Sequence, residues 1–398
     1  MRSQRAAAWC IVLSLIGLGV AGYLSALHIG LMRGELLGEV FCGGSGVFNC
    51  HAVTASSWGS LLGMPLSLWG AIGYCAALGL SILALQEGQW PAHAMTLLLG
   101  LGLLFLAFDL FLLGVMIFVL KAFCLFCMIT YLVNFLIVVL AARSLQQPWI
   151  QALGRIDASL SALVPSSRRP AAWFFWGIVF IGFGAVASLH AATIYVNRGT
   201  FGSLQKQMTE YIQKQVPTPP DTGGRPMKGN PKGALKIVEF SDFLCPVCQR
   251  AAKMNQIILT GNRNTVMIVY KHFPLDSTCN EKLSRNVHPG ACQVAAATVC
   301  AHQQGKFWEF HDKIFEEGHD YKAVNLESDA DRLGLDVGKF SACMASGEGM
   351  RVVKEDIEEA NKLGVTSTPT HFLNGIKLVG LLTPDRFEEF STAILNTK

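Results

Sequence analysis

Five apolar stretches constrain the fold of this chain more than any other feature of the sequence. They lie at residues 8–31, 65–85, 94–119, 123–142 and 172–195. Each is close to the ~20 apolar residues that a helix needs to cross a bilayer. Hydrophobic residues make up 51% of the 398 residues and charged residues only 15%, which is more apolar surface than one soluble core requires. The sequence therefore predicts five membrane helices.

The third and fourth stretches are separated by very little charged sequence. Asp109 and Lys121 are the only charged residues within 94–142. A single helix of that length, at ~1.5 Å per residue, would far exceed a hydrocarbon core of ~30 Å, so we expect a hairpin of two helices. An alternative for the first stretch is a cleaved signal peptide with Arg2 and Arg5 as its basic start. Its apolar part is long for that and lacks a clean small-x-small cleavage site.

Positive charges in the short connections predict the orientation of the helices, because cytoplasmic loops carry the excess of Lys and Arg. With the N-terminus inside, the external connections hold only Arg33 and Lys121. The cytoplasmic segments hold Arg2, Arg5, Arg143, Arg155, Arg168 and Arg169. Five crossings then place the sequence after residue 195 outside the cytoplasm, where thiols are oxidised.

The sequence after the fifth stretch changes character twice. Residues 196–216 are polar, and a run rich in proline and glycine begins at Pro217, which is typical of a linker. The rest reads as a globular α/β domain, with strands at 235–240 and 266–270 and helices that start near 245 and 307. The expected organisation is a membrane domain at 1–145, a cytoplasmic connection and fifth helix at 146–195, a linker at 196–233 and a globular domain at 234–398.

Twelve cysteines, most of them at short spacing, favour an oxidising compartment or a redox enzyme. Three dithiols stand out on the predicted external side: the loop pair Cys42 and Cys50, the pair Cys124 and Cys127 at the start of the fourth apolar stretch, and the pair Cys245 and Cys248 in the globular domain. A thiolate attacks a disulfide through a mixed disulfide, so neighbouring dithiols can pass an electron pair along a relay.

The globular motif Cys245-Pro-Val-Cys248 has a local physical logic. It follows a strand, so Cys245 falls at a helix N-terminus and Pro246 at the first helical position, where its missing N–H costs nothing. Free amides and the helix dipole stabilise a thiolate there, which makes Cys245 the attacking and leaving group and Cys248 the resolving thiol. Glu239 on the preceding strand is either a buried carboxylate that relays the proton of Cys248 or an ordinary strand charge.

The order of strand, Cys245-Pro-Val-Cys248, helical segment and Thr368-Pro369 before a last strand resembles the DsbA-like branch of the thioredoxin fold. The resemblance covers residues 234–398. It implies that Pro369 is in cis and packs against the dithiol, and that reduced exported proteins are the substrates. Val247 departs from the strongly oxidising members of that family, which have a histidine at this position.

The membrane half carries a second set of motifs. Cys42 and Cys50 are followed by Ser56-Ser-Trp-Gly and by Gly63-Met-Pro-Leu, and the later helix reads Cys124-Leu-Phe-Cys127-Met-Ile-Thr-Tyr131. This pattern resembles the vitamin K epoxide reductase family, whose fold is a four-helix membrane bundle around a quinone. Bacterial members are often fused through a fifth helix to a thioredoxin-like domain, which implies a bacterial cytoplasmic membrane with the soluble domain on its periplasmic or extracytoplasmic side.

This second resemblance also implies an order of exchange. Cys127 would face the quinone, either ubiquinone or menaquinone, Cys124 would exchange with Cys50, and Cys42 would exchange with the soluble domain. Ser56 and Tyr131 fall at positions that the family uses near the quinone. The second apolar stretch offers no asparagine to match the one that contacts quinone in some animal members.

The remaining polar and sulfur groups have simpler interpretations. Cys279 with Cys292 and Cys300 with Cys343 are expected as structural disulfides, although four cysteines allow three connectivities. Cys10 and Cys75 are expected as small buried residues, and no metal site is expected because the histidines lack ligand spacing. Asp109 is either functional or paired inside the bundle. No dense basic run suggests nucleic acid.

Three functions remain open at this stage. The favoured one is a thiol oxidase that passes electrons from exported proteins through the three dithiols to quinone. The alternative is a thiol-disulfide reductase or isomerase that delivers electrons to periplasmic substrates. A thiolate metal binder is disfavoured because over a hundred residues and a linker separate the two Cys-x-x-Cys motifs.

Overall fold

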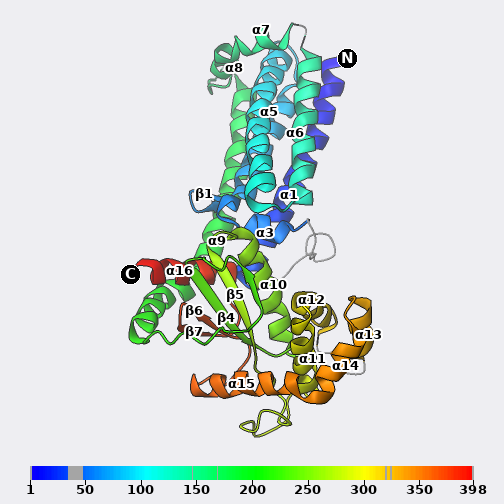
Figure 1. Cartoon of the computed structure of the whole chain (residues 1–398). Coiled ribbons are helices and arrows are strands. Elements are labelled where there is room, and N and C mark those ends of the chain that lie inside the picture. The colour runs from blue at the N-terminus through cyan, green and yellow to red at the C-terminus, as the bar shows by residue number, and fades with distance from the viewer. Residues whose placement is uncertain are drawn as a thin grey trace. The chain divides into compact units, whose positions relative to one another are not determined.

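The computed structural model of the chain (Figure 1) forms two compact units, Met1–Gly202 and Ser203–Lys398. The structure describes residues 2–34, 48–145, 147–167, 169–318, 321–322 and 325–396, with only the helical backbone at 192–209. The first unit is helical with several apolar helices, and the second is an α/β domain.

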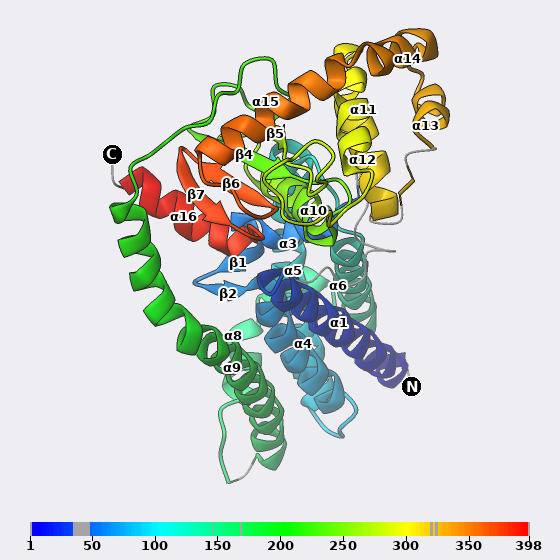
Figure 2. The ribbon, with the colours of Figure 1, turned by 90° about the horizontal axis from the view of Figure 1, so that it is seen from below.

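Five helices in the described part of the chain are long and apolar enough to cross a membrane, as the five apolar stretches predicted. They are α1 (Arg2–Met32), α4 (Leu66–Leu83), α5 (Trp90–Gly114) with its continuation η2 (Val115–Leu120), α6 (Leu125–Ser144) and the first part of α9 (Pro170–Lys214). Helix α1 packs against α4 and α6, and α5 packs against both α4 and α6. Figures 1 and 2 show these four helices as a bundle.

The predicted hairpin of the third and fourth stretches is confirmed. The chain leaves η2, a segment of π-helix, at Lys121, which takes a left-handed φ of 51°, and α6 begins four residues later. The two helices then approach so closely that a Cβ added at Gly102 would lie 2.7 Å from the Val138 side chain. Small residues permit such close helix packing in membranes.

Short elements connect the long helices. At one end of the bundle are α3 (Cys50–Ala55), the 3₁₀ turn η1 (Ser57–Gly59), and the paired strands β1 (Ser60–Leu61) and β2 (Met64–Pro65). Two short helices, α7 (Trp149–Leu153) and α8 (Ile156–Ala162), precede α9 and contact α5.

The expected linker differs from the structure. Helix α9 continues through the polar stretch to Lys214. The run after it lies along the second unit: strand β3 (Met227–Gly229) pairs with β5 (Val266–His272), and the Arg225 guanidinium donates to the buried carboxylate of Asp356 at 2.7 Å. Proline and glycine mark irregular backbone, and here that backbone is held by the domain it joins.

The second unit is built on one five-stranded mixed sheet in the order β3-β5-β4-β6-β7. Strand β4 (Leu235–Ser241) is parallel to β5 and antiparallel to β6 (Thr370–Leu373), which in turn pairs with β7 (Ile376–Val379). The sequence predicted β4 and β5 from their apolar runs, and both are buried along most of their length, as expected for central strands covered on two faces.

Helices cover both faces of this sheet (Figure 2). Alternate residues of β4 point to opposite sides, so Ile237 packs with α10 (Pro246–Gly261) and α16 (Pro384–Asn396), whereas Val238 and Phe240 pack with α15 (Glu348–Lys362). The parity of the strand therefore assigns Glu239 to the same face as α10.

A helical insertion separates β5 from α15. It comprises α11 (Ala291–Gln303), α12 (Phe307–Glu317), α13 (Leu326–Arg332) and α14 (Val337–Ser346). Disulfides join Cys279 to Cys292 and Cys300 to Cys343. The first closes the loop before α11 and the second ties α11 to α14.

Candidate redox sites

The membrane dithiol lies at the start of α6. Cys124 is the N-cap residue, and its Sγ accepts the backbone N–H of Cys127 at 3.1 Å. The two cysteines form a disulfide with Cα atoms 5.2 Å apart. Cys124 has no exposed surface, whereas Cys127 is half-buried and lines a cavity. The two sulfurs therefore have different surroundings, with only Cys127 open to the bundle interior.

Backbone pairing brings a third cysteine, Cys50, toward this dithiol. Phe48 and Phe123 form a parallel bridge, and the Asn49 N–H donates to the Phe123 carbonyl at 2.9 Å. Cys50 and Cys124 each follow this pairing directly. Cys50 is buried and starts α3, whose N-cap Asn49 accepts the Ala52 N–H at 2.9 Å. Its predicted partner Cys42 lies outside the described residues.

The cavity beside Cys127 has a volume of about 450 Å³. Its walls are mostly apolar and come from α1, the α3–η1 segment, α4, α5, η2 and α6. The polar side chains in its lining include Tyr74, Asp109, Thr130, Tyr131 and Asn134. An apolar cavity with a few convergent polar groups is the usual form of a small-molecule site.

Ser56 does not reach this cavity, although the sequence placed it near the quinone. Its hydroxyl donates to the Val53 carbonyl at 2.8 Å at the end of α3. Neighbouring residues Thr54 and Trp58 line the cavity instead. Tyr131 does line it, one helical turn after Cys127, as residues i and i+4 share a helix face.

Three polar side chains from three helices form a network in the cavity wall. The Tyr74 hydroxyl of α4 donates to Asn134 Oδ1 of α6 at 2.9 Å, and Asn134 Nδ2 donates to Asp109 Oδ2 of α5 at 2.9 Å. Sequence reasoning noticed Asp109 because a charged group inside a membrane is expensive. It missed the roles of Tyr74 and Asn134, whose partners lie on other helices.

The soluble dithiol has the arrangement that the sequence predicted. Cys245 immediately precedes α10, and Pro246 occupies its first turn. Cys245 is 6% exposed and Cys248 is fully buried. A hydrogen bond from the Cys248 thiol lowers the pKa of Cys245 to about 6, and burial raises the pKa of Cys248 well above its ordinary value. This difference suits Cys245 for attack and release and Cys248 for resolution.

A cis peptide bond joins Thr368 to Pro369 beside this dithiol. The Cys245 thiol contacts the Thr368 carbonyl at 3.7 Å. Pro369 immediately precedes β6, so the end of that strand is fixed against the active thiol.

Glu239 lies beneath the dithiol on β4. It is 2% exposed, and its Oε2 accepts the Asn255 Nδ2–H of α10 at 2.5 Å. Burial raises the pKa of Glu239 to about 7. The negative charge of Glu239 in turn contributes to the raised pKa of Cys248. Of the two interpretations left open by the sequence, the buried carboxylate is the one that this geometry supports.

Asp242, at the end of β4, is a site residue that sequence reasoning missed. Its N–H donates to Cys248 Sγ at 3.5 Å, and its carbonyl accepts the Cys245 N–H at 3.1 Å. Its buried carboxylate lies 2.7 Å from Nδ1 of His288. The only sequence signal for this residue is its position, three residues before Cys245.

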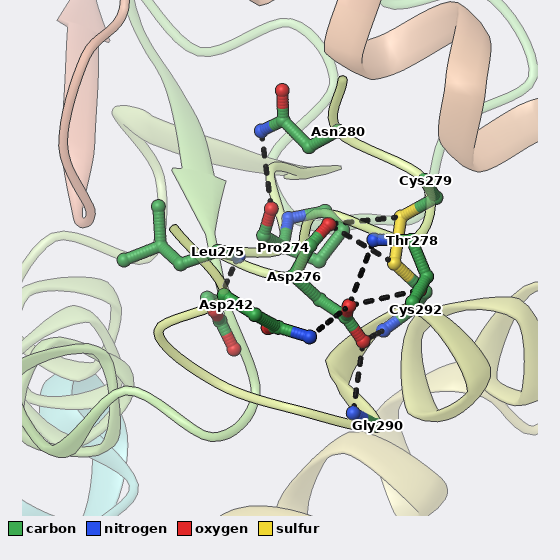
Figure 3. Close-up of a disulfide and its surroundings, with 10 residues drawn as sticks. Asp242, Pro274, Leu275, Asp276, Thr278, Cys279, Asn280, Gly290 and Cys292 are labelled. Carbon is green, nitrogen blue, oxygen red and sulfur yellow. Dashed lines mark hydrogen bonds between the residues drawn. A yellow bond between two sulfur atoms is a disulfide. The ribbon is translucent and has the colours of Figure 1, made fainter. Parts of the chain in front are cut away.

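The loop that carries His288 is closed by the Cys279–Cys292 disulfide. Asp276 organises it: the carboxylate accepts the N–H groups of Thr278 and Gly290 at 3.0 and 2.8 Å, as Figure 3 shows. Within the described ranges, no cluster of three or more His, Cys, Asp or Glu side chains is suited to hold a metal ion.

Comparisons with known families agree with the two-part architecture. Residues 8–142 match the vitamin K epoxide reductase family, and residues 236–391 match the DSBA-like thioredoxin domain. Among solved structures, the chain is similar to a thioredoxin-like oxidoreductase from Silicibacter pomeroyi, with 26% identity, a TM-score of 0.37, and coverage of 44% of this chain and 92% of that one. It is also similar to BdbD from Bacillus subtilis, with 19% identity, a TM-score of 0.37, and coverage of 46% and 96%.

Curated relatives are matched over only part of their length. The chain is 31% identical over 185 residues to the Na(+)/H(+) antiporter NhaA 3 of Salinispora tropica, which covers 46% of this chain and 26% of that protein. It is 33% identical over 164 residues to the Na(+)/H(+) antiporter NhaA 1 of Salinispora arenicola, with coverage of 41% and 23%. The chain thus spans about a quarter of the length of these relatives.

Proposed function

We propose that this chain, whose residues 8–142 match the vitamin K epoxide reductase family and whose residues 236–391 match the DSBA-like thioredoxin domain, is a disulfide oxidoreductase that oxidises exported proteins and passes their electrons to quinone. The observation that carries the proposal is the presence in one chain of a thiol pair suited to exchange and a second pair beside an apolar cavity.

The first proposed step takes place at Cys245 and Cys248. A substrate thiolate attacks the Cys245 sulfur of their disulfide, and Cys248 leaves and takes up a proton. A second substrate thiolate then attacks the substrate sulfur of the mixed disulfide, and Cys245 leaves as a thiolate. The substrate gains one disulfide, and the dithiol gains two electrons. The low pKa of Cys245 favours its release, and Glu239 is suited to hold and return the proton of Cys248.

The second proposed step carries the electron pair into the bundle. The Cys245 thiolate attacks Cys42 of the loop disulfide and Cys50 leaves; Cys248 then attacks Cys245, which re-forms their disulfide and releases Cys42. Cys50 next attacks Cys124 and Cys127 leaves, and Cys42 attacks Cys50 to re-form the loop disulfide and release Cys124. The pairing of residues 48–49 with Phe123 supports this route because it holds Cys50 and Cys124 at adjacent ends of two joined segments. The Cys124–Cys127 disulfide is thereby reduced to a dithiol.

The cavity fits a quinone ring in the chemistry of its walls. Most of the side chains around its volume of about 450 Å³ are apolar, and the polar groups in its wall include Cys127 and Tyr131. A bound quinone would accept two electrons and two protons from the dithiol. Cys127 would hold the thiolate that faces it, and Tyr131 would donate a hydrogen bond to a ring oxygen. Asn134 holds Asp109 at the wall, where that carboxyl can exchange a proton.

The predicted orientation completes the proposal. The six arginines on one side of the helices favour a cytoplasmic N-terminus, which sets the soluble domain on the periplasmic or extracytoplasmic side of a bacterial membrane. Disulfides at Cys279–Cys292 and Cys300–Cys343 fit that compartment because thiols there are kept oxidised.

The experiment that tests this function follows quinone absorbance under anaerobic conditions. The full chain in detergent is mixed with a reduced, unfolded cysteine-containing protein and a soluble quinone analogue. We expect quinol to form in step with disulfides in the substrate. The Cys127→Ala variant should leave the soluble dithiol reducible by substrate but stop quinone turnover, whereas the matched Cys75→Ala variant, which alters a buried free thiol of α4, should retain it.

Two results would contradict the proposal. Continued quinone reduction by Cys127→Ala would remove the membrane dithiol from the route. An unchanged quinone together with reduction of added protein disulfides would show that electrons flow toward the substrate, as in the reductase alternative.

A further inference from the structure

The soluble motif brings no charge of its own between its cysteines, because Pro246 and Val247 separate them. A thiolate at Cys245 must therefore obtain its electrostatic support from hydrogen bonds or from charged groups on other segments. Asp242 and His288 are the charged pair that lies beside it, and the proposed route for electrons gives neither of them a role.

Asp242 connects the dithiol to its surroundings through both backbone and side chain. Its backbone contacts both cysteines, as described above. Its carboxylate is buried and accepts the N–H groups of Leu244 and Leu275, each at 2.7 Å. Because these donors fix both carboxylate oxygens, the position of Asp242 relative to Cys245 is set by the fold rather than by a free side chain.

His288 reaches this carboxylate from the loop closed by the Cys279–Cys292 disulfide. The backbone N–H groups of Val287 and His288 donate to the Leu275 carbonyl at 3.0 and 2.9 Å. Leu275 is also the residue whose N–H contacts Asp242, which Figure 3 shows beside the disulfide. The ring Nδ1 lies 2.7 Å from Asp242 Oδ2, and the side chain keeps 19% of its surface exposed. The histidine is thus anchored at its base and open to protons from solvent.

We propose that the Asp242–His288 pair is the charge partner of the Cys245 thiolate, with His288 acting as a positioning residue that stabilises this thiolate as the attacking and leaving group. The inference requires that Cys245 be the exchanging thiol. It does not require a particular direction of electron flow or a quinone.

The charged groups around the pair agree with this role. Asp242 and the Cys245 thiolate both raise the pKa of His288, and the larger cause is the hydrogen bond that the His288 ring donates to the Asp242 carboxylate. By linkage, an imidazolium favoured by the thiolate favours the thiolate in return. Cys245 also faces Cys248 and the Thr368 carbonyl, and Cys248 faces Glu239 and the Asp242 backbone. The Cys248 thiol has the largest effect on the pKa of Cys245. The charge of His288 adds to that effect.

The protonation state of His288 decides whether the Asp242–His288 pair favours or disfavours the Cys245 thiolate. Below its raised pKa, the imidazolium offsets the Asp242 charge and adds attraction for the thiolate. Above it, the Asp242 carboxylate stands near Cys245 without a cation, which disfavours the thiolate. The benefit of His288 is therefore present at low pH, where a thiolate is hardest to form.

The test measures alkylation of Cys245 by iodoacetamide from pH 5 to pH 9 in the full, reduced chain in detergent. Mass spectrometry of the peptide that carries Cys245 gives the rate for this thiol alone. In His288→Gln an amide replaces the imidazole, so a hydrogen bond to Asp242 is kept and the charge is lost. We expect a rate about five- to tenfold lower at pH 5–6 and unchanged at pH 9, which corresponds to about one pKa unit.

A second variant and a control separate charge from structure. His288→Lys keeps a positive charge, and we expect its rate at pH 6 to stay within about twofold of the original chain. The control His302→Gln changes a half-buried histidine of α11 and should leave the profile unchanged. A His288→Gln profile that superimposes on the original would overturn the proposal, as would equal losses in His288→Gln and His288→Lys. Because alkylation of Cys245 does not involve quinone, this profile is expected even if the chain fails to reduce quinone.

Discussion

The backbone N–H of Asn49 donates to the carbonyl of Phe123 at 2.9 Å. These residues are far apart in the sequence, yet each is followed at once by a cysteine, Cys50 or Cys124. A loop that must exchange with a membrane dithiol needs its sulfur held at the right place, and a backbone hydrogen bond achieves this without depending on any side chain. Thiol exchange between Cys50 and Cys124 is the step for which this pairing is suited.

Removal of Cys42 and Cys127 together should therefore trap the exchange. In the double variant Cys42→Ala, Cys127→Ala neither Cys50 nor Cys124 keeps its resolving partner, so we expect a disulfide between Cys50 and Cys124 to accumulate after the chain is reduced and reoxidised. Mass spectrometry of non-reduced peptides detects it. The Cys75→Ala chain should lack this species, and the absence of the cross-link in the double variant would rule out the proposed partner.

Tyr131 provides a prediction on quinone recognition. Tyr131→Phe removes one hydrogen-bond donor from the cavity wall and keeps the ring. Loss of one hydrogen bond of about 0.5–1.5 kcal/mol should raise the KM for quinone about three- to tenfold, with little change in exchange at the soluble dithiol. Steady-state quinone reduction measures it. Tyr23→Phe is the control, because Tyr23 packs against Phe126 and does not line the cavity; equal KM values for the two variants would contradict the assignment.

Glu239 makes the stability of the soluble unit depend on pH. Its pKa is raised to about 7 in the folded state, so the folded chain holds a proton that the unfolded chain releases near the ordinary value of ~4.3. The unfolded state binds fewer protons between these values, and stability therefore falls as pH rises.

The size of this effect follows from the same two values. We expect a loss of about 2–3 kcal/mol between pH 5 and pH 8, measured as opening of β4 and β5 amides by hydrogen exchange. Glu239→Gln should remove most of the slope. A slope that persists in this variant would assign the pH dependence to other groups.

The Cys300–Cys343 disulfide should stabilise the helical insertion. It closes a loop across 43 positions of sequence, and the chain-entropy relation for such a loop gives about 3–4 kcal/mol. Replacement of both cysteines by serine should lower the thermal midpoint of the soluble unit and speed proteolysis of α11 and α14. Replacement of Cys10, a buried free thiol of α1, serves as the comparison, and matching midpoints would show that the disulfide adds nothing.

Much of this fold could be predicted because its signals are local. Apolar length predicted the membrane helices, and the alternation of β4 is enough to place Glu239 on the same face as Ile237 once the strand is recognised. The position of Cys245 at a helix start follows from Pro246 in the same way. These features depend on a few consecutive residues, so no knowledge of distant contacts was needed.

The features that sequence reasoning missed depend on distant partners. Asn134 looks like one polar residue in an apolar helix until Tyr74 and Asp109 meet it from two other helices. Arg225 looked like part of a linker because its partner Asp356 lies 131 residues away. Proline and glycine near Arg225 signal irregular backbone, but they do not indicate whether that backbone is free or bound.

The two disulfides of the soluble unit give the proposed activity a circular dependence. Cys279–Cys292 fixes the loop that presents His288, and Cys300–Cys343 ties the insertion together. A newly made copy needs the product of the reaction it is proposed to catalyse before it is complete. Under the proposed activity, mature copies would oxidise the cysteines of newly made ones, and the first copy would need another oxidant.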